Sequence, residues 1–258
     1  MSVNSYLTSL ASSLVLTSAE STSINTSINT LVTRLNLYFP NSINKQFQFG
    51  SSTRGTILPR RYDVNSDIDY LIEFKTSYSE IKKPQTYLNY LKTFAENKYS
   101  TSFVTQSFPT IVLELNHIKF ELVPSIKTSS NYLIPSKSFS DWIETNPNEF
   151  NSKLTYANTN NYSMIKPLVR LIKYWNAKNN YCFSSYELEN YICDINFFNC
   201  RNLNDYFYTF WEKMNYSHNT SIEVKNKVDR MKRYVSNIKI YERMGQSTTA
   251  EIEIKKIL

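Results

Sequence analysis

Two aspartates separated by one residue open the segment DIDYLIEF, residues 67–74. Its composition predicts a β-strand, and side chains alternate across a strand, so Asp67 and Asp69 share one face while Ile68 takes the other. Two carboxylates ~5 Å apart repel by about 3 kcal/mol at an effective dielectric near 20, which favours a cation beside them. Mg²⁺ prefers such hard oxygen ligands together with phosphate oxygens. An isolated pair of this kind is common in strands, so it does not decide the chemistry.

Glu121 lies in the apolar segment IKFELVPS, residues 118–125, which also predicts a strand. A buried, ionised glutamate needs a partner. That partner is either a basic residue in a salt bridge or, if this strand lies beside the strand of Asp67 and Asp69, a shared divalent ion. In the second case Asp67, Asp69 and Glu121 hold two Mg²⁺ ions, with Mn²⁺ as a substitute, which together bind a triphosphate and activate a hydroxyl.

A turn and a basic loop precede the aspartates. Gly50 and Ser51 follow the expected strand 45–49, and glycine lets a backbone approach a phosphate closely while the serine and adjacent amides donate to it. Arg54, Arg60 and Arg61 add positive charge to the same loop. The order of strand, Gly-Ser, loop, Asp-x-Asp strand and later glutamate is far more specific than any one part, and predicts a metal-dependent nucleotide site.

The surrounding elements predict an α+β fold with a small mixed sheet followed by helices. An initial helical segment precedes a long helix over 18–37, and a polar, unburied segment runs over 51–66. A helix is expected over 84–98, strands over 110–115 and 118–123, and a polar loop from 124 to 138. Helices are then expected over 139–157, 162–178, 185–198, 202–215 and 220–242, before a tail from Gly245 that is either an edge strand or disordered.

The amino-acid composition limits the classes of ligand, cellular compartment and metal site that are compatible with this chain. The 258 residues carry a net charge of +7, which is compatible with phosphate-rich ligands. Three cysteines without a CxxC pair favour a reducing compartment, the cytoplasm, over a disulfide framework or zinc knuckle. Two histidines leave little room for histidine-rich metal sites. The N-terminal twenty residues lack the basic start of a secretory signal, and no apolar run is long enough to span a bilayer.

These motifs resemble the DNA polymerase β-like nucleotidyltransferase superfamily and, within it, the cGAS/DncV-like nucleotidyltransferases (CD-NTases) of bacterial anti-phage defence. The resemblance covers roughly residues 20–200 and rests on the segments GSSTRGT (50–56), SDIDYLIEF (66–74), FELVPS (120–125), LVRLIKYWN (168–176) and SSYELE (184–189). It implies a polymerase β-like palm over 1–158, with the N-terminal long helix, and a helical lobe over 159–258 that closes the nucleotide site. Many relatives have aspartate where this chain has Glu121.

The resemblance also implies nucleotide contacts outside the carboxylate segment. Lys173 matches a lysine that contacts the triphosphate, Ser185 a serine that contacts phosphate, and Tyr186 an aromatic that stacks on the donor base. Each has a plainer alternative: Lys173 as a solvated helix position, Ser185 as the N-cap of a helix, and Tyr186 as a core or surface tyrosine. Trp175 is expected in the core.

The resemblance implies a template-independent enzyme that joins NTPs or dNTPs into a cyclic or linear oligonucleotide messenger, sensed by a downstream effector protein. Base preference, linkage and priming group stay open, with Tyr241 in the tail as one candidate primer. Two alternatives remain: a toxin–antitoxin nucleotidyltransferase that modifies protein or tRNA, and an inactive basic module that binds nucleotides or nucleic acid. Three intact carboxylates count against the inactive module.

Overall fold

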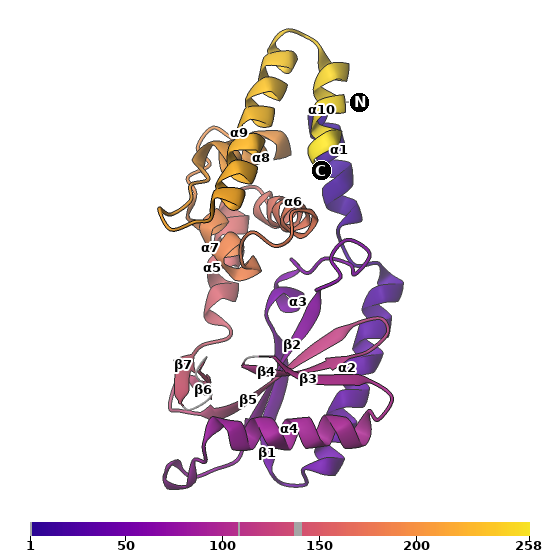
Figure 1. Cartoon of the computed structure of the whole chain (residues 1–258), viewed down its shortest axis with the longest axis vertical. Helices are drawn as coiled ribbons and strands as arrows, with labels where there is room; N and C mark the ends of the chain where they lie inside the picture. The colour runs from indigo at the N-terminus through magenta and orange to yellow at the C-terminus, as the bar shows by residue number, and fades with distance from the viewer. Residues whose placement is uncertain (1, 108, 137–140) are drawn as a thin grey trace. The chain divides into compact units, whose positions relative to one another are not determined.

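The computed structural model describes residues 2–107, 109–136 and 141–258 (Figure 1). The chain forms two compact units, one of Leu16–Glu149 and one of Met1–Val15 with Phe150–Leu258. The first residues therefore belong with the C-terminal helices, whereas the predicted division at residue 158 placed them with the sheet. None of the described helices is both long and apolar enough to cross a membrane.

The unit of Leu16–Glu149 is built on a mixed sheet, as predicted. Its central path runs β1-β2-β5-β4-β3, with β6 pairing β5, and β7 pairing β6. Strands β2 and β5 are parallel to each other, and the other pairs are antiparallel. The strands are β1 (Ile43–Phe49), β2 (Asp67–Phe74), β3 (Phe103–Ser107), β4 (Thr110–Glu114), β5 (Lys119–Lys127), β6 (Tyr132–Pro135) and β7 (Trp142–Thr145).

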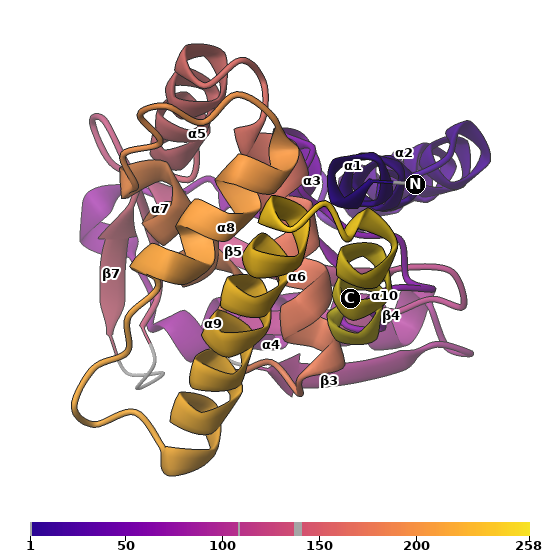
Figure 2. The same ribbon diagram turned by 90° about the horizontal axis from the view of Figure 1, so that it is seen from above.

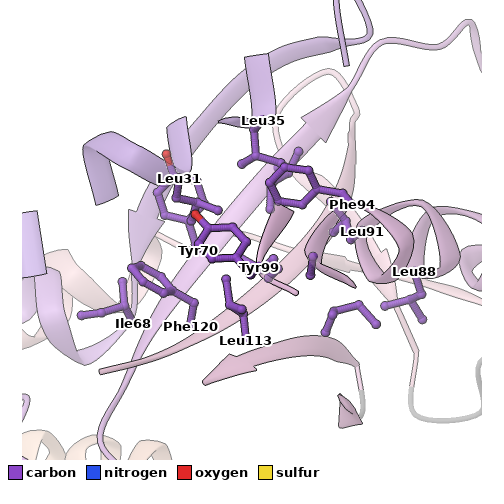
Figure 3. Close-up of a cluster of buried hydrophobic side chains, with 14 of the residues drawn as sticks. Leu31, Leu35, Ile68, Tyr70, Leu88, Leu91, Phe94, Tyr99, Leu113 and Phe120 are labelled. Atoms are coloured by element: carbon purple, nitrogen blue, oxygen red, sulfur yellow. The ribbon is translucent and has the colours of Figure 1, made fainter. Parts of the chain in front are cut away.

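Helices α2 (Ser18–Tyr38) and α4 (Pro84–Lys98) cover one face of this sheet. A capping box between Thr17 and Glu20 starts α2, and Pro84 occupies the first turn of α4, where its missing amide costs nothing. The side chains that both helices bury meet the even-numbered residues of β2 and β5 in one apolar cluster (Figure 3). The labelled members of this cluster are Leu31, Leu35, Ile68, Tyr70, Leu88, Leu91, Phe94, Tyr99, Leu113 and Phe120.

The second unit is helical. It contains α1 (Val3–Ser13), α5 (Glu149–Asn160), α6 (Ile165–Lys178), α7 (Ser185–Asp194), α8 (Leu203–Lys213), α9 (Ile222–Arg243) and α10 (Ser247–Ile257). Helix α10 lies beside α9 and α1 (Figure 2). Trp175 is buried as predicted and packs edge-to-face on Trp211, with ring centroids 4.6 Å apart. A hydrogen bond of 3.2 Å from the Arg170 Nε to the Ala11 carbonyl joins α6 to α1.

Three sequence predictions about elements were wrong. The segment 124–138 is not a loop where it is described, because β5 continues through Pro124 to Lys127 and β6 follows. The helix expected over 139–157 is replaced by β7 and a helix from Glu149, and residues 139 and 140 lie outside the described ranges. The tail is helix α10, because Ala250, Ile254 and Leu258 recur every four residues and are all buried.

The segment 51–66 was also expected to be unburied. It contains the short helix α3 (Ser51–Arg54), and Ile57 and Leu58 after it are 5% and 0% exposed. These two buried apolar residues anchor the segment. The polar composition of the rest of the segment is the reason that the sequence did not predict their burial. The basic loop is consequently packed against the sheet unit along part of its length.

Leu31 and Leu37 provide a matched test of the core on α2. Leu31 is fully buried in the apolar cluster, whereas Leu37 is 75% exposed. We expect Leu31→Ala to lower the free energy of unfolding by about 2–5 kcal/mol, because it leaves a cavity, and Leu37→Ala to change it by less than about 0.5 kcal/mol. Urea denaturation of both variants checks this, and equal losses would contradict the packing described.

Candidate active site

The pairing of β2 with β5 brings the three predicted carboxylates together. In this parallel register Asp69 lies beside Glu121, and Asp67 lies beside Lys119. Ile68 and Phe120, the residues between them, are 1% and 0% exposed in the cluster under α2 and α4. The carboxylates therefore project from the opposite face of the sheet, where Asp67 and Glu121 are about a quarter exposed.

Lys119 stands between two of these carboxylates. Its Nζ is 3.4 Å from Asp67 Oδ2 and 3.7 Å from Glu121 Oε1. The sequence analysis did not select this lysine. Its position two residues before Glu121 was a usable signal, because residues i and i+2 of a strand share a face.

The electrostatics of the cluster disfavour three negative charges. Burial and, after it, the charge of Asp67 raise the pKa of the Glu121 carboxyl to about 7, against the opposing effect of Lys119. The Lys119 ammonium thus offsets part of the negative charge that the two strands bring together.

The donor set fits divalent cations. Three carboxylates from two adjacent strands are the hard oxygen ligands that Mg²⁺ takes, and they carry more charge than Lys119 alone balances. Within the described ranges no three His, Cys, Asp or Glu side chains are already arranged around a common metal position. The Lys119 ammonium instead contacts both Asp67 and Glu121. A divalent cation held by these two carboxylates would compete with this ammonium for them.

Gly50 shapes the same site from β1. Its backbone has φ +74°, and a Cβ added there would lie 1.8 Å from Asp69 Oδ2. No side chain can occupy that space, so only glycine lets the turn between β1 and α3 close over the Asp69 carboxylate. The sequence predicted that Gly50 lets the backbone approach a phosphate. The structure shows in addition that the backbone at Gly50 lies close to the Asp69 carboxylate.

Two other predicted residues follow Gly50 in α3. The Ser51 hydroxyl is partly exposed and has no hydrogen-bond partner within the described part of the chain, so it is available to a ligand. Arg54 is 9% exposed, which leaves little of its side chain accessible. The burial of Arg54 thus gives less support to its predicted nucleotide contact than the exposure of Ser51 gives to the contact predicted for Ser51.

The remaining arginines of the loop are committed to carboxylates. Arg60 donates to Glu114 Oε1 at 2.9 Å and to the Val64 carbonyl at 3.0 Å. Arg61 forms an ion pair of 2.5 Å with Glu20 at the start of α2. Both side chains hold the loop to the sheet unit rather than presenting unpaired charge.

Lys173 and Glu189 form a buried ion pair within the helical unit. Lys173 Nζ is 3.5 Å from Glu189 Oε1, and their side chains are 5% and 0% exposed. Lys173 is therefore not the solvated position that was its alternative. Removing either partner would leave an uncompensated buried charge, which is strongly destabilising.

Ser185 and Tyr186 occupy the first turn of α7. The N-cap is Ser184, whose hydroxyl accepts a hydrogen bond from the Glu187 amide in a capping box, so the alternative that made Ser185 the N-cap was wrong. Tyr186 is 58% exposed and lies edge-to-face with Phe150, with centroids 5.1 Å apart. It is a surface tyrosine, and its ring can still stack on a planar ligand.

Comparison with known proteins places this chain in a family. Residues 1–158 match the Second Messenger Oligonucleotide or Dinucleotide Synthetase domain, SMODS. The chain belongs to that family. The matched range contains Gly50, Asp67, Asp69 and Glu121, whereas Lys173, Ser185 and Tyr186 lie beyond it.

One curated relative and two solved structures add detail. A probable cyclic nucleotide synthase of Bacillus cereus (strain VD146) is 34% identical over 95 residues, which are 34% of this chain and 28% of that protein. The match thus spans under a third of the length of that curated relative. The CD-NTase CdnG of Bradyrhizobium diazoefficiens in complex with GTP superposes with a TM-score of 0.70 at 11% identity, over 97% of both chains. CdnC of E. coli MS115-1, in a complex with HORMA-deltaN, gives 0.69 at 13% identity, over 97% of this chain and 96% of that one. The CD-NTase fold predicted from the sequence is confirmed.

Gly50 and Gly55 both have a positive φ, but only Gly50 lies against a carboxylate. Alanine variants at these two positions therefore distinguish the effect of backbone strain from the effect of displacing Asp69. We expect Gly50→Ala to weaken Mn²⁺ binding by at least about tenfold, because its Cβ displaces Asp69. Gly55 has φ +71°, and a Cβ added there would have nothing within 4 Å. Gly55→Ala should therefore lower the free energy of unfolding by only about 1 kcal/mol and leave the affinity for Mn²⁺ unchanged. Isothermal titration calorimetry measures both, and equal losses of affinity would contradict the role of Gly50.

Glu121→Gln tests the charge cluster without metal. A raised pKa means that protonated Glu121 stabilises the fold at low pH, and that this stabilisation is lost as the pH rises from about 4.5 through about 7. In EDTA at pH 8 we therefore expect Glu121→Gln to be more stable than the parent by about 1–2 kcal/mol, a few degrees in Tm, with the gap closing toward pH 5.

The control is Glu96→Gln on the exposed surface of α4, which should leave Tm unchanged at both pH values. Millimolar Mg²⁺ should raise the Tm of the parent but not that of Glu121→Gln. A Glu121→Gln protein that is less stable at pH 8 in EDTA would show that the three carboxylates do not repel as described.

Proposed function

We propose that this chain is a Mg²⁺-dependent, template-independent nucleotidyltransferase that joins nucleoside triphosphates into a cyclic or linear oligonucleotide messenger in the cytoplasm. The observation that carries the proposal is the register of β2 with β5, which sets Glu121 beside Asp69 next to the Gly50 turn. Membership of the SMODS family supports the class of product.

Asp67, Asp69 and Glu121 would hold the metal. When bound, Mg²⁺ supplies charge neutralisation of the triphosphate and lowers the pKa of an acceptor hydroxyl. Lys119 then leaves the carboxylates, and its ammonium is available to the phosphates that bring the cations. Gly50 fixes the carboxylate of Asp69, and the Ser51 hydroxyl donates to a phosphate oxygen.

Residues of the helical unit are proposed as further nucleotide contacts. Tyr186 has an accessible ring for a nucleobase, and Ser185 lies in the first turn of α7, where backbone amides attract anions. Lys173, paired with Glu189, has the weakest case for direct contact and would act through the position of α7.

The molecules found in structures of similar proteins suggest the substrates and the partner of this chain. The CdnG structure contains GTP and the CdnC structure contains HORMA-deltaN, so we propose NTPs as substrates and a protein regulator or effector as partner in anti-phage defence. The base and sugar, the linkage and the priming group stay open. The toxin–antitoxin alternative and the inactive module have less support, because the SMODS family is defined by synthesis of nucleotide messengers.

Incubation of the purified protein with each labelled NTP and dNTP, singly and in pairs, tests the proposal. In Mg²⁺ or Mn²⁺ we expect a product longer than the substrate without any added protein, tRNA or template. Phosphatase treatment before chromatography separates the forms, because a cyclic product lacks the terminal phosphates that a linear one loses.

The Asp67→Asn, Asp69→Asn double variant should reduce synthesis by at least about 10³-fold, since it removes ligands required for catalysis. Asp194→Asn, at an exposed ion pair on α7, is the matched control and should keep full synthesis. Labelling that appears only when a protein or tRNA is added would support the toxin–antitoxin alternative, and full synthesis by the double variant would overturn the site.

A further inference from the structure

A second candidate site lies wholly within the helical unit. A cavity of about 650 Å³ opens where the end of α5 and the turn after it meet the connection from α7 to α8. This volume is in the range of small-molecule sites. Its lining includes Asn160, Tyr162, Asn196, Phe198, Asn199 and Arg201, none of which belongs to the predicted nucleotide-binding set.

Two large aromatic rings stand exposed at this cavity. Phe198 is 82% exposed and Tyr162 is 79% exposed. A single exposed aromatic residue is ordinary, but two at the mouth of one pocket offer faces on which a planar ligand can stack. Neither ring forms an aromatic pair with another described residue, whereas the neighbouring Phe197 packs on Tyr206 at 4.8 Å and stabilises the floor.

The backbone carrying these rings is held in an uncommon conformation. Tyr162 has φ 51° and Asn199, next to Phe198, has φ 70°. A left-handed conformation is unusual for a bulky residue such as tyrosine. Hydrogen bonds fix both turns: the Ser163 amide donates to the Asn158 carbonyl at 2.8 Å, and the Phe198 amide donates to Asn196 Oδ1 at 2.9 Å. The aromatic rings are thus presented by ordered turns.

Polar groups at the cavity are available for a ligand. The side-chain amides of Asn160 and Asn199 make no hydrogen bond with any described residue, and each offers both a donor and an acceptor. Asn161, in contrast, is used by the fold, since its Nδ2 donates to the Ala157 carbonyl at 2.8 Å and its Oδ1 accepts from the Tyr206 hydroxyl at 3.4 Å.

Arg201 adds one cation. Its side chain is exposed, and within the described ranges its guanidinium has neither an ion pair nor a hydrogen bond. The planar guanidinium matches phosphate oxygens bidentately. The described lining residues include no acidic side chain, but Asp205 Oδ2 accepts a hydrogen bond of 2.9 Å from the Arg201 backbone amide and places one carboxylate beside the cavity. An anionic group would therefore depend on the Arg201 guanidinium for its positive partner.

We infer that this cavity binds one nucleotide unit, with the base stacked on Phe198 and Tyr162, its edge read by asparagine amides, and its phosphate at Arg201. A single-stranded nucleic acid offers the same chemistry, but it needs a cationic track along several phosphates, and Arg201 is the one cation among the described lining residues. A small nucleotide acting as a regulator fits better. The inference does not depend on the proposed synthesis.

Calorimetry with AMP, GMP, CMP and UMP tests it. The titrations use the full chain carrying Asp67→Asn and Asp69→Asn, in EDTA, so that the metal-dependent site does not contribute. We expect saturable binding of at least one monophosphate with a Kd below about 1 mM, and weaker binding of the matching nucleoside, because only the phosphate meets Arg201.

Three variants locate the site. Phe198→Ser and Tyr162→Asn, where asparagine tolerates the left-handed backbone, should each raise the Kd about 5- to 100-fold. Arg201→Gln should remove the preference for monophosphate over nucleoside. Tyr156→Asn, which is 73% exposed outside the cavity, and Arg233→Gln, exposed on α9, are the controls and should bind like the parent.

Thermal melts confirm that each variant is folded. Absence of saturation by any monophosphate at 5 mM, or equal affinity in the three variants and the controls, would overturn the inference. A ten-residue oligonucleotide that binds more than about tenfold tighter than its monomer would also overturn it, because the site would then follow a strand.

Discussion

Repulsion among three carboxylates governs the candidate active site. The pairing of β2 with β5 places Asp67, Asp69 and Glu121 on one face, where the Lys119 ammonium contacts Asp67 and Glu121. The fold cannot relieve this by turning the strands over, because the alternate residues, including Ile68 and Phe120, are locked in the core under α2 and α4. The apolar cluster therefore maintains a charge arrangement that divalent cations and phosphates would stabilise, at some cost to the protein without them.

The surroundings of the cluster are consistent with that constraint. Gly50 lets the turn after β1 approach Asp69 where no side chain fits, and Arg60 and Arg61 secure the following loop through Glu114 and Glu20. The carboxylate face itself is left partly exposed, so a ligand can reach it. Rigid strands hold the acidic side chains, whereas the long side chain of Lys119 can change its contacts with little disturbance of the backbone.

The sequence predicted the strand of Asp67 and Asp69 and most of the later helices because their periodicities are local. It also predicted that Glu121 joins Asp67 and Asp69 if their strands are adjacent, a condition that the order of the motifs favoured. The parallel pairing of β2 with β5 that makes them adjacent is a long-range contact that local periodicity does not specify. The tail was ambiguous because IEIKKI alternates like a strand, and the burial of Ala250, Ile254 and Leu258 that makes it helical depends on packing against other helices. Likewise, the buried pairing of Lys173 with Glu189 and the contact of Lys119 with Asp67 on the neighbouring strand depend on tertiary structure that no spacing rule specifies. The contact of Lys119 with Glu121 differs, because their i, i+2 spacing already puts them on one face.

The most direct test is a crystal structure of the protein grown with Mn²⁺ and a non-hydrolysable nucleoside triphosphate, with data collected at the manganese absorption edge. The account predicts anomalous density bounded by the carboxylate oxygens of Asp67, Asp69 and Glu121, and Lys119 Nζ displaced from Asp67 and Glu121. Manganese bound elsewhere, with the Lys119 ammonium still between those two carboxylates, would contradict it.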